Sequence, residues 1–577
     1  MPRRRLLLGV VMAAALLVAG RAVSAVYADY TWYRAMGASP VWSERISDMV
    51  LIYGAGFALS FSVALANLSA LTRSIGALTL PRRLANVEFG EALPRRYLDR
   101  FALVLSLGIA AALLPLLPDW TSLALARLDV TFRESDPYFH HDLAFYTTWL
   151  PFERSFYVWA MLLIVTVSLI VVALYSLTPG LRWEQAGLRM SARVRQHLSA
   201  LAAIILLLTM WSYRLASYDL LIQTAGESAT FSFVEHQWLL PGLLILSIAT
   251  VAVAATVLIS GWTGQLRTSL VAVTGMIILS IAVQEVAPLI VRRFTAPEAL
   301  AANERPYTAT RAEFTRRAYD LGPAIDGGTG RREPADGDTT GLGGQMLSSP
   351  GPDSLVYPDA EGLVVIADPQ LDVAAPRLGD GLSRLGYAWA YQSLGLLSDS
   401  VPRRARIVTV RDVRRRVERL APAFIQGSTT RQLYNADTLY WKVELYSASS
   451  DYPLSQARVL AGAHRNYFRH AATALVNART ARVIIAASPS PDPIAREWMR
   501  VFPNTADQRG PAILSRLSET PLTPAESNAN AALNDSTFRA QVTRLYNMMR
   551  ASLAAGSLKE FSTAYDSLGL ILGQSRK

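Results

Sequence analysis

The sequence contains no cysteine, only six histidines and few charged residues for its length. The absence of cysteine excludes disulfide bonds, thiolate nucleophiles, iron–sulfur clusters and zinc sites built on cysteine. The sequence also lacks a glycine-rich phosphate loop followed by Lys and Ser or Thr, an HExxH zinc motif and a GxSxG nucleophile motif. It therefore predicts no cofactor and offers no catalytic signature.

The residues that are abundant are apolar. Charged residues make up 18% of the 577-residue chain and hydrophobic residues 51%, whereas soluble domains are roughly 25% charged. A helix needs about 20 apolar residues to cross a bilayer, and seven runs approach this length. They lie near residues 6–26, 48–70, 101–118, 156–177, 198–216, 238–260 and 268–291. The sequence therefore predicts an α-helical polytopic membrane bundle over residues 1–292, with the lipid bilayer as its first partner.

Arginine collects in alternate loops of this predicted bundle. The N-terminus and the loops after the second and fourth spans carry most of it, whereas the intervening loops are acidic. Because positively charged short loops stay in the cytoplasm, the pattern predicts a multi-pass protein of the plasma (inner) membrane, with a cytoplasmic N-terminus and an extracytoplasmic C-terminal part. The first run also resembles a cleavable signal peptide, and cleavage would leave every later loop on the same side. The net charge of +11 reflects these loops, so we expect no nucleic-acid partner.

The second half of the chain has a different composition. Residues 293–321 are polar and helical in pattern, which indicates a stalk, and residues 322–358 form a Gly-rich flexible linker. Beyond the linker, the runs GLVVIAD, RIVTVRD, TLYWKVELYS and ARVIIAAS indicate strands, and helical patterns occur near 378–397, 411–420 and 465–478. Residues 359–577 are therefore predicted to be an extracytoplasmic α+β domain that ends in a helical pair near 535–553 and 557–574. We detect no internal repeat.

The segment DPYFHHDLAFYTTWLPF resembles a motif of a bacterial membrane family called uncharacterised protein family 0182. The motif reads Asp-Pro-x-Phe-x-x-Asp-x-x-Phe-Tyr, followed by Leu-Pro-Phe. It is matched here by Asp136, Pro137, Phe139, Asp142, Phe145, Tyr146 and Pro151. Further residues match the family in order: Glu304, Pro306, Tyr307, Arg316, Tyr319, Trp441, Tyr452, Pro453, Asn466, Asp492 and Pro493. The chain is thus identified as a shortened member, with a short linker where the family has a longer stretch. The resemblance implies seven spans, an outer domain and no known activity.

Three groups of residues are candidates for chemistry. Asp136, His140 and Asp142 could hold a metal ion, although Asp136 and Asp142 also suit the capping of turns or helices. Arg214 and Glu285 fall within apolar spans, where they either reach the membrane surface or form a pair along a polar path. A basic run from Arg403 to Arg419 could meet anionic lipid or form a solvated helix face.

The leading functional prediction is binding or assembly in the cell envelope through the outer domain, with an envelope polymer, lipid or protein as the partner. The first alternative is a transporter or an accessory subunit of one, which predicts polar residues exposed to water within the bundle. The second is an envelope enzyme acting on lipid-linked or glycan substrates, which predicts convergent carboxylates in a cleft. The sequence leaves the oligomeric state open.

Overall fold

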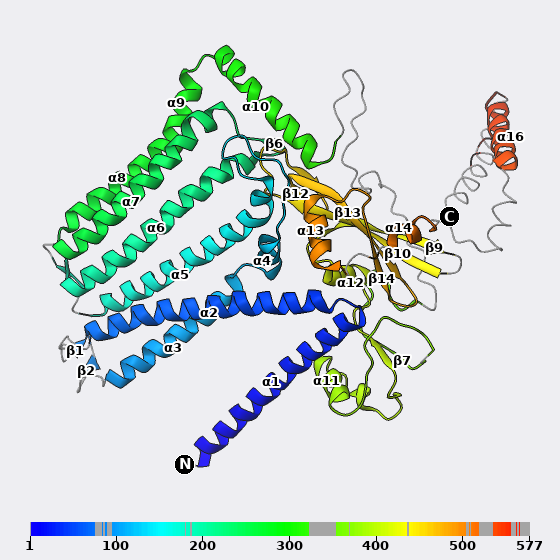
Figure 1. Ribbon diagram of the computed structural model, residues 1–577, viewed down its shortest axis with the longest axis horizontal. Helices are drawn as coiled ribbons and strands as arrows, with labels where there is room; N and C mark the ends of the chain where they lie inside the picture. Colours follow the sequence, from blue (N-terminus) through cyan, green and yellow to red (C-terminus); the bar gives the residue numbers. More distant parts are fainter. Residues whose placement is uncertain are drawn as a thin grey trace.

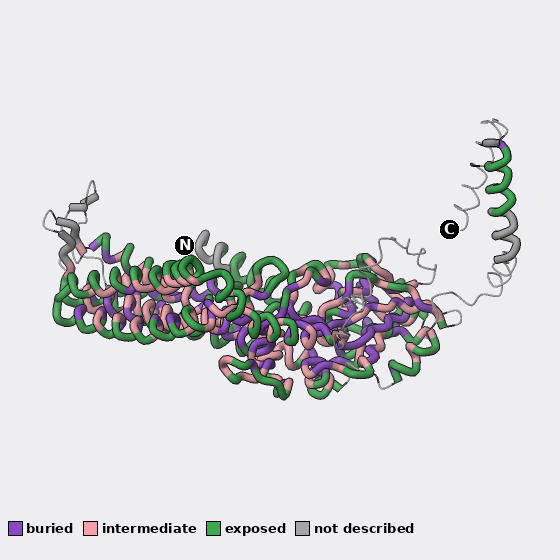
Figure 2. The backbone as a smooth tube through the Cα atoms, turned by 90° about the horizontal axis from the view of Figure 1, so that it is seen from above, coloured by how far each residue is buried: buried purple, intermediate pink, exposed green. Residues whose placement is uncertain are grey.

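The structure is a computed structural model in which a bundle of long helices adjoins a smaller α+β domain (Figure 1). It describes residues 2–75, 83–84, 87–88, 95–178, 181–184, 187–321, 354–368, 370–435, 438–503, 507, 509–517, 535–554, 561 and 565. Figure 2 shows that buried residues are densest in the α+β domain, while much of the surface of the long helices is exposed.

Seven long apolar helical segments form the N-terminal part, as the sequence predicts. Each is long and apolar enough to cross a membrane, which is consistent with a multi-pass membrane protein. Their principal helices are α1 (Pro2–Ala35), α2 (Ser39–Ile75), α3 (Arg95–Leu113), α5 (Leu150–Ser176), α6 (Ala192–Ile222), α7 (Leu240–Thr263) and α8 (Leu266–Ile281). Helices α2, α3 and α5–α8 lie side by side, whereas α1 diverges from them (Figure 1).

Three wide π-helical turns interrupt these segments, each two residues before a proline. They are η2 (Phe145–Trp149), η3 (Glu235–Leu239) and η4 (Ala282–Val286), and they precede Pro151, Pro241 and Pro288. Proline lacks the N–H that an α-helix requires and its ring displaces the carbonyl four residues earlier, so a wider turn accommodates it. The recurrence is a repeated structural element that the sequence analysis missed.

Shorter elements connect the long helices. Helix α4 (Trp120–Arg127) begins at Asp119, whose side chain accepts from the Thr121 N–H, and η1 (Leu114–Leu116) contains Pro115. Helix α9 (Ala287–Phe294) completes the seventh segment and α10 (Pro297–Ala318) follows it. Three antiparallel hairpins pair β1 (Arg83–Leu84) with β2 (Val87–Glu88), β3 (Leu181–Glu184) with β4 (Gly187–Met190), and β5 (Thr224–Ala225) with β6 (Ser228–Ala229).

The α+β domain contains a four-stranded antiparallel sheet in the order β14-β13-β10-β9. Its strands are β9 (Ile425–Asn435), β10 (Thr438–Ser449), β13 (Tyr467–Asn477) and β14 (Val483–Ala487). The smaller pairs are β7 (Val364–Ile366) with β8 (Arg406–Val408) and β11 (Arg458–Leu460) with β12 (Ala463–Arg465). The helices of the domain are α11 (Leu382–Ala390), η5 (Leu394–Leu397), α12 (Val413–Leu420), α13 (Pro493–Val501) and α14 (Gly510–Leu514), and α16 (Asp535–Ala554) lies apart from the sheet (Figure 1).

The domain is joined to the bundle through its core. Trp32, Tyr33 and Val41, at the turn between α1 and α2, are buried in the same apolar cluster as Trp441 and Val443 of β10. Burial of large apolar side chains is the main stabilising contribution to such a contact. The α1–α2 turn is therefore part of the α+β domain's core.

Two sequence-based assignments in this half are wrong. The helical pattern near residues 465–478 predicts a helix, but β13 runs through them between β10 and β14 and is buried over most of its length. The predicted linker ends too late, because Val356 is fully buried and its carbonyl accepts from the Trp441 Nε1–H. The remainder of that linker, residues 322–353, and most of the predicted helix at 557–574 lie outside the described residues.

Candidate functional site

The loop between α4 and η2 is folded around two carboxylates. Asp136 is 1% exposed and accepts hydrogen bonds from the N–H groups of Tyr138 (2.9 Å), Phe139 (2.6 Å) and His141 (2.9 Å). The Tyr146 hydroxyl donates a fourth at 3.0 Å. Both oxygens of Asp136 are thus occupied by donors from its own loop, and the carboxylate replaces the backbone acceptors that this tight turn lacks.

Asp142 organises the other side of the same loop. Its oxygens accept from the N–H groups of Phe132 and Arg133 at 3.0 Å each and from Ala144 at 2.8 Å. His140 has a φ of 60° and is exposed. Within the described part of the chain, no group of three or more His, Cys, Asp or Glu residues could hold a metal ion. The geometry therefore assigns Asp136 and Asp142 to loop folding, and a metal site on Asp136, His140 and Asp142 does not fit it.

Aromatic side chains pack this loop against the bundle and against α10. Phe139 and Phe145 meet the ring of Tyr218 on α6 at centroid distances of 4.9 and 5.1 Å. Tyr307 of α10 bonds to His236 Nδ1 at 2.8 Å. Such edge-to-face pairs add stability beyond their buried area. The family residues of the loop and of α10 therefore meet in one cluster at the end of the bundle.

Glu304 and Arg311 connect α10 to the turn before η3. The Glu304 carboxylate accepts from the Phe233 N–H at 3.1 Å and from Arg311 at 2.9 Å. Arg311 also donates to the Phe231 carbonyl at 2.5 Å. The segment predicted to be a stalk is thus bonded to the bundle from Glu304 onward.

A loop of the α+β domain, residues 450–456, docks directly on the bundle. The Leu454 N–H donates to the Leu221 carbonyl at the end of α6, at 2.6 Å. Asn466 fixes the loop, because its side chain accepts from the Tyr452 N–H (2.9 Å) and donates to the Tyr452 carbonyl (2.8 Å). The Tyr319 hydroxyl reaches the carbonyls of Gln456 and Arg465. The family residues Tyr319, Tyr452 and Asn466 therefore hold one contact between the two parts.

Ion pairs strengthen the same contact. Arg154 of α5 pairs with Asp451 at 2.7 Å and with Asp219 of α6. Arg214 pairs with Glu153 at 3.1 Å. The hypothesis that Arg214 pairs with Glu285 is therefore wrong, because α6 presents Arg214 to α5 instead. Glu285 lies elsewhere, in a cavity of about 560 Å³ that Glu235, Gln284 and Arg292 also line.

Asp492 lies at the base of a cavity where the α+β domain meets the loop. It is 2% exposed, caps α13 through the N–H groups of Ile494 and Ala495, and accepts from the Ser447 and Tyr467 hydroxyls at 2.7 and 2.8 Å. Burial raises the pKa of Asp492, and the hydrogen bonds oppose that rise. The resemblance selects Asp492 without indicating its partners, and the fold supplies four donors to its carboxylate.

This cavity, which we call the junction cavity, has a volume of about 410 Å³. Arg133 of the loop, Arg469 of β13 and Arg496 of α13 line it, together with the segment 488–493. Arg469 pairs with Asp320 at 3.0 Å, and the Asp320 side chain is 80% exposed. Three arginines from distant parts of the sequence thus line one cavity, together with the acids Asp320 and Asp492.

His470, which also lines the junction cavity, is held by Glu444. Its Nε2 lies 2.9 Å from the Glu444 carboxylate, which also accepts from Thr473 at 2.6 Å and Lys442 at 2.5 Å. Burial alone raises the pKa of Glu444, but the hydrogen bonds from His470, Lys442 and Thr473 bring it down to about 2. Glu444 therefore remains ionised and orients one wall of the cavity.

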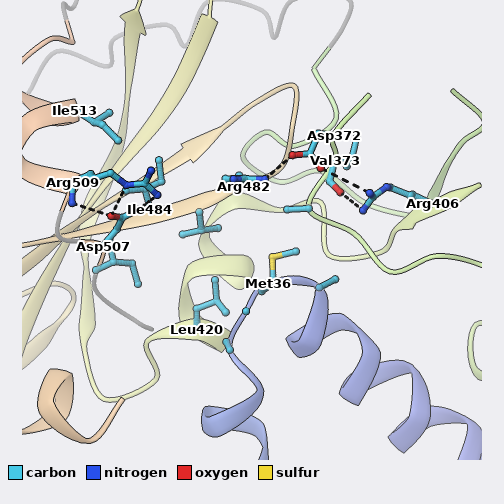
Figure 3. Close-up of a pocket in the computed structure, with 16 residues that line it drawn as sticks. Met36, Asp372, Val373, Arg406, Leu420, Arg482, Ile484, Asp507, Arg509 and Ile513 are labelled. Atoms are coloured by element: carbon cyan, nitrogen blue, oxygen red, sulfur yellow. Dashed lines mark hydrogen bonds and ion pairs between the residues drawn. The ribbon is translucent and has the colours of Figure 1, made fainter. Parts of the chain in front are cut away.

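A second cavity, of about 470 Å³, lies between the α1–α2 turn and the α+β domain (Figure 3). Its charged groups pair with one another. Figure 3 shows Arg482 directed at Asp372, 2.7 Å away, and Arg509 beside Asp507. The hydrogen bonds from Arg509 lower the pKa of Asp507. Because Arg406, Arg482 and Arg509 each pair with one of these two acids, this cavity favours no ligand of one charge.

The basic run from Arg403 to Arg419 does not form one surface. Arg406, Arg411 and Arg414 donate to backbone carbonyls, and Arg419 pairs with Asp29 at 3.3 Å. Arg416 is fully buried and donates to the carbonyls of Val410 and Ala481. Burial and the charge of Arg419 lower the pKa of Arg416 to about 9. Most arginines of this run therefore bind carbonyls or carboxylates of the protein itself.

The other family residues have structural positions. Trp441 is in the core of the domain, Pro151 and Pro493 occupy the first turns of α5 and α13, and Pro306 lies within α10. Pro137 is exposed in the loop turn, Pro453 precedes Leu454 in the docking loop, and Arg316 is half-buried near the end of α10. Sequence reasoning missed Glu153, whose partners Trp211 and Arg214 lie about 60 positions away, and Arg133 and Arg496, which meet only at the junction cavity. The sequence does offer one indication of Glu153, because it is a charged residue directly after the Leu-Pro-Phe motif.

Comparison with known proteins agrees with the resemblance. A family model described as "Uncharacterised protein family (UPF0182)" matches residues 6–329 and 372–512. A UPF0182 protein of Kocuria rhizophila is 22% identical over 655 residues, which cover 87% of this chain and 66% of that protein. A UPF0182 protein of Mycobacterium tuberculosis is 28% identical over 331 residues, covering 56% of this chain and 34% of that protein.

The chain therefore spans less than two thirds of the length of these relatives in each alignment. No solved structure matches the chain. Because the family model covers most of the sequence, the chain belongs to the uncharacterised protein family UPF0182.

Proposed function

We propose that this UPF0182 protein spans the plasma membrane seven times and presents its α+β domain on the extracytoplasmic side, where the junction cavity binds an anionic group of an envelope lipid, polymer or protein. The observation that carries the proposal is the convergence of Arg133, Arg469 and Arg496 on one cavity beside the bundle. Guanidinium groups suit phosphate and carboxylate ligands because they donate in a planar fork.

The membrane position is supported by the surface of the long helices. Large apolar side chains such as Val18, Val104, Leu169 and Ile248 are more than half exposed. Exposed apolar bands of this length suit contact with lipid.

The orientation is supported by the arginine-rich hairpins. Figure 1 shows β1 and β2, and the junction of α5 with α6, at the end of the bundle away from the α+β domain. Arginines collect in these hairpins and at the adjoining helix ends, for example Arg83, Arg182 and Arg189. If these arginines lie in the cytoplasm, the α+β domain, at the other end of the bundle, lies on the extracytoplasmic side.

Binding of inorganic phosphate and of glycerol 3-phosphate tests the proposed site. The full chain in phosphatidylcholine nanodiscs is titrated calorimetrically with each probe. Arg496→Ala is expected to weaken binding at least about tenfold, the effect of losing one charge-assisted contact. Arg500→Ala is the matched control, because it lies one turn along α13 and pairs with Glu497 outside the cavity. Absence of binding, or an equal effect of both variants, would contradict the proposal.

Transport is a second candidate, favoured by the π-helical turns at η3 and η4. They flank the cavity that holds Glu235 and Glu285, and Gln284 donates to Ser280, which also accepts from Tyr213. Interrupted helices beside polar groups are common where transporters bind their substrates. Transport requires water to reach Ser280, so Ser280→Cys should react with an impermeant thiosulfonate. Protection of this cysteine, with Glu285→Cys reactive, would reject a path through the bundle.

A further inference from the structure

Helix α11 of the α+β domain lies beside α1 (Figure 1). The Tyr387 hydroxyl donates to Thr31 at 2.7 Å, Tyr27 and Ser383 share a hydrogen bond of 2.9 Å, and the Trp389 Nε1–H reaches the Leu17 carbonyl at 3.4 Å. The contacts extend from residue 31 back to residue 17, which is about 21 Å along α1 at about 1.5 Å per residue. Trp389 therefore reaches the apolar stretch of the first span.

The face of α11 next to its contact with α1 is apolar, and Trp389 lies at the border between the two. Leu382, Leu385 and Trp389 follow one side of the helix at the spacing of helical neighbours, and Leu382 is 86% exposed. Leu394 and Leu397 of η5 extend the face, and Leu394 is 76% exposed. Leu385, Trp389 and Leu397 are 51%, 36% and 40% exposed, so the described residues leave much of this face open. An apolar face of this kind is unfavourable in water.

Arg384 is the charged residue between Leu382 and Leu397, and its side chain turns inward. Arg384 donates to the carbonyls of Leu396, Ser398 and Val401. These are the carbonyls at the end of η5 and just beyond it, and a short helix cannot satisfy them itself. In a hydrocarbon environment, backbone carbonyls must accept hydrogen bonds from within the protein, because no water is available there. Arg384 thus both neutralises the end of η5 and keeps its own charge off the apolar face.

The apolar face continues the lipid-facing surface of α1. Val18 and Val23 of α1 are 71% and 70% exposed, and they flank the contact that Trp389 makes with α1. Arg403 and Arg404 follow the segment and are exposed, as suits contact with lipid phosphates.

We propose that α11 and η5 form a wedge that inserts among the acyl chains of the leaflet on the side of the α+β domain. The wedge, defined by Leu382, Leu385, Trp389, Leu394 and Leu397, anchors the domain to lipid independently of the loop at 450–456. It rests on the proposed membrane position of the bundle but not on any ligand of the junction cavity. In this proposal, lipid covers the apolar face of the wedge. The main alternative is that a second protein covers it.

Site-specific labelling tests the wedge, because the chain contains no cysteine of its own. Leu385→Cys, Leu394→Cys, Val18→Cys and Val459→Cys are each labelled with the fluorophore NBD. The full chain is placed in nanodiscs of phosphatidylcholine and phosphatidylglycerol, with and without lipid that carries a doxyl quencher on its acyl chain. Val18 represents the span, and Val459, 57% exposed on β11, represents the water-facing surface of the domain.

We expect the probes at 385 and 394 to emit at shorter wavelength than the probe at 459, and to be quenched by doxyl lipid as the probe at 18 is. Quenching at 18 without quenching at 385 and 394 overturns the wedge and leaves the membrane position intact. A blue shift at 385 without quenching identifies a protein cover instead and also overturns it. Quenching at none of the four positions rejects the membrane position itself.

Discussion

Replacement of Asp136 by asparagine is predicted to destabilise the chain by about 2–4 kcal/mol. The two carboxylate oxygens accept from the N–H groups of Tyr138, Phe139 and His141 and from the Tyr146 hydroxyl. Asparagine keeps the shape but presents an NH₂ group to one pair of these donors. An unsatisfied buried donor costs about 1–3 kcal/mol, and the loss of negative charge weakens the remaining bonds by about 1 kcal/mol.

Thermal unfolding of the full chain in nanodiscs, followed by tryptophan fluorescence, measures this effect. The Tm of the 577-residue chain should fall by about 2–3 °C, because an unfolding entropy of about 2.1 cal/mol/K per residue corresponds to roughly 0.8 °C per kcal/mol at this length. Asp129→Asn, an exposed position on the same loop, should leave the Tm unchanged. Zinc should not raise the Tm of the wild type, because both oxygens of Asp136 are occupied. An unchanged Tm for Asp136→Asn, or a zinc-dependent rise that this variant abolishes, would refute the reasoning.

Three further predictions follow from buried polar groups. The pKa of Glu444 falls from 4.5 to about 2 on folding, so its ionised form stabilises the domain above pH 4.5 and this contribution is lost as the pH falls toward 2. Glu444→Gln should therefore flatten the decline of Tm over that range, and an unaltered profile would contradict the assignment. Arg416→Lys should lower the Tm more than Arg415→Lys, because the buried guanidinium reaches several carbonyls at once and residue 415 is exposed. Asn466→Ala should cost about 1–3 kcal/mol, since the Tyr452 N–H loses its acceptor, and a Tm equal to that of the wild type would show that another group fixes the loop.

The long helices could be predicted from the sequence because crossing a bilayer imposes a length on an apolar run. The sequence predicts seven runs, and the described part of the chain contains seven long apolar helices. Their ends were predicted less well, since α2 extends from Ser39 to Ile75 where the apolar run suggested 48–70. The extra turns place Val41 in the core of the α+β domain, a tertiary contact that hydropathy does not report.

The strand β13 shows why part of the α+β domain could not be predicted. Ala471, Ala472 and Ala474 favour a helix intrinsically, yet they are fully buried in an interior strand of the sheet. Burial on both faces removes the alternation of apolar and polar residues by which a strand is recognised. Tertiary contacts within the sheet, and not the intrinsic preference of alanine for helix, therefore determine the conformation of this segment.

The candidate site required the fold. The resemblance could select Asp136, Tyr452, Asn466 and Asp492, but not the contacts that they make. Arg133 and Arg496 are more than 350 positions apart in the sequence and carry no motif. Only the docking of the domain on the loop between α4 and η2 brings them to one cavity. A similar limit applied to Arg214, whose partner depends on which face of α6 meets α5.

The central claim is that the α+β domain and its junction cavity lie outside the cytoplasm. It is tested most directly by adding single cysteines at Val459 of the domain and at Arg193, which begins α6 at the opposite end of the bundle. Spheroplasts are treated with an impermeant maleimide before and after permeabilisation. Our account predicts labelling at 459 in intact spheroplasts and labelling at 193 only after permeabilisation. The reverse pattern would place the domain and the junction cavity in the cytoplasm and contradict the proposed function.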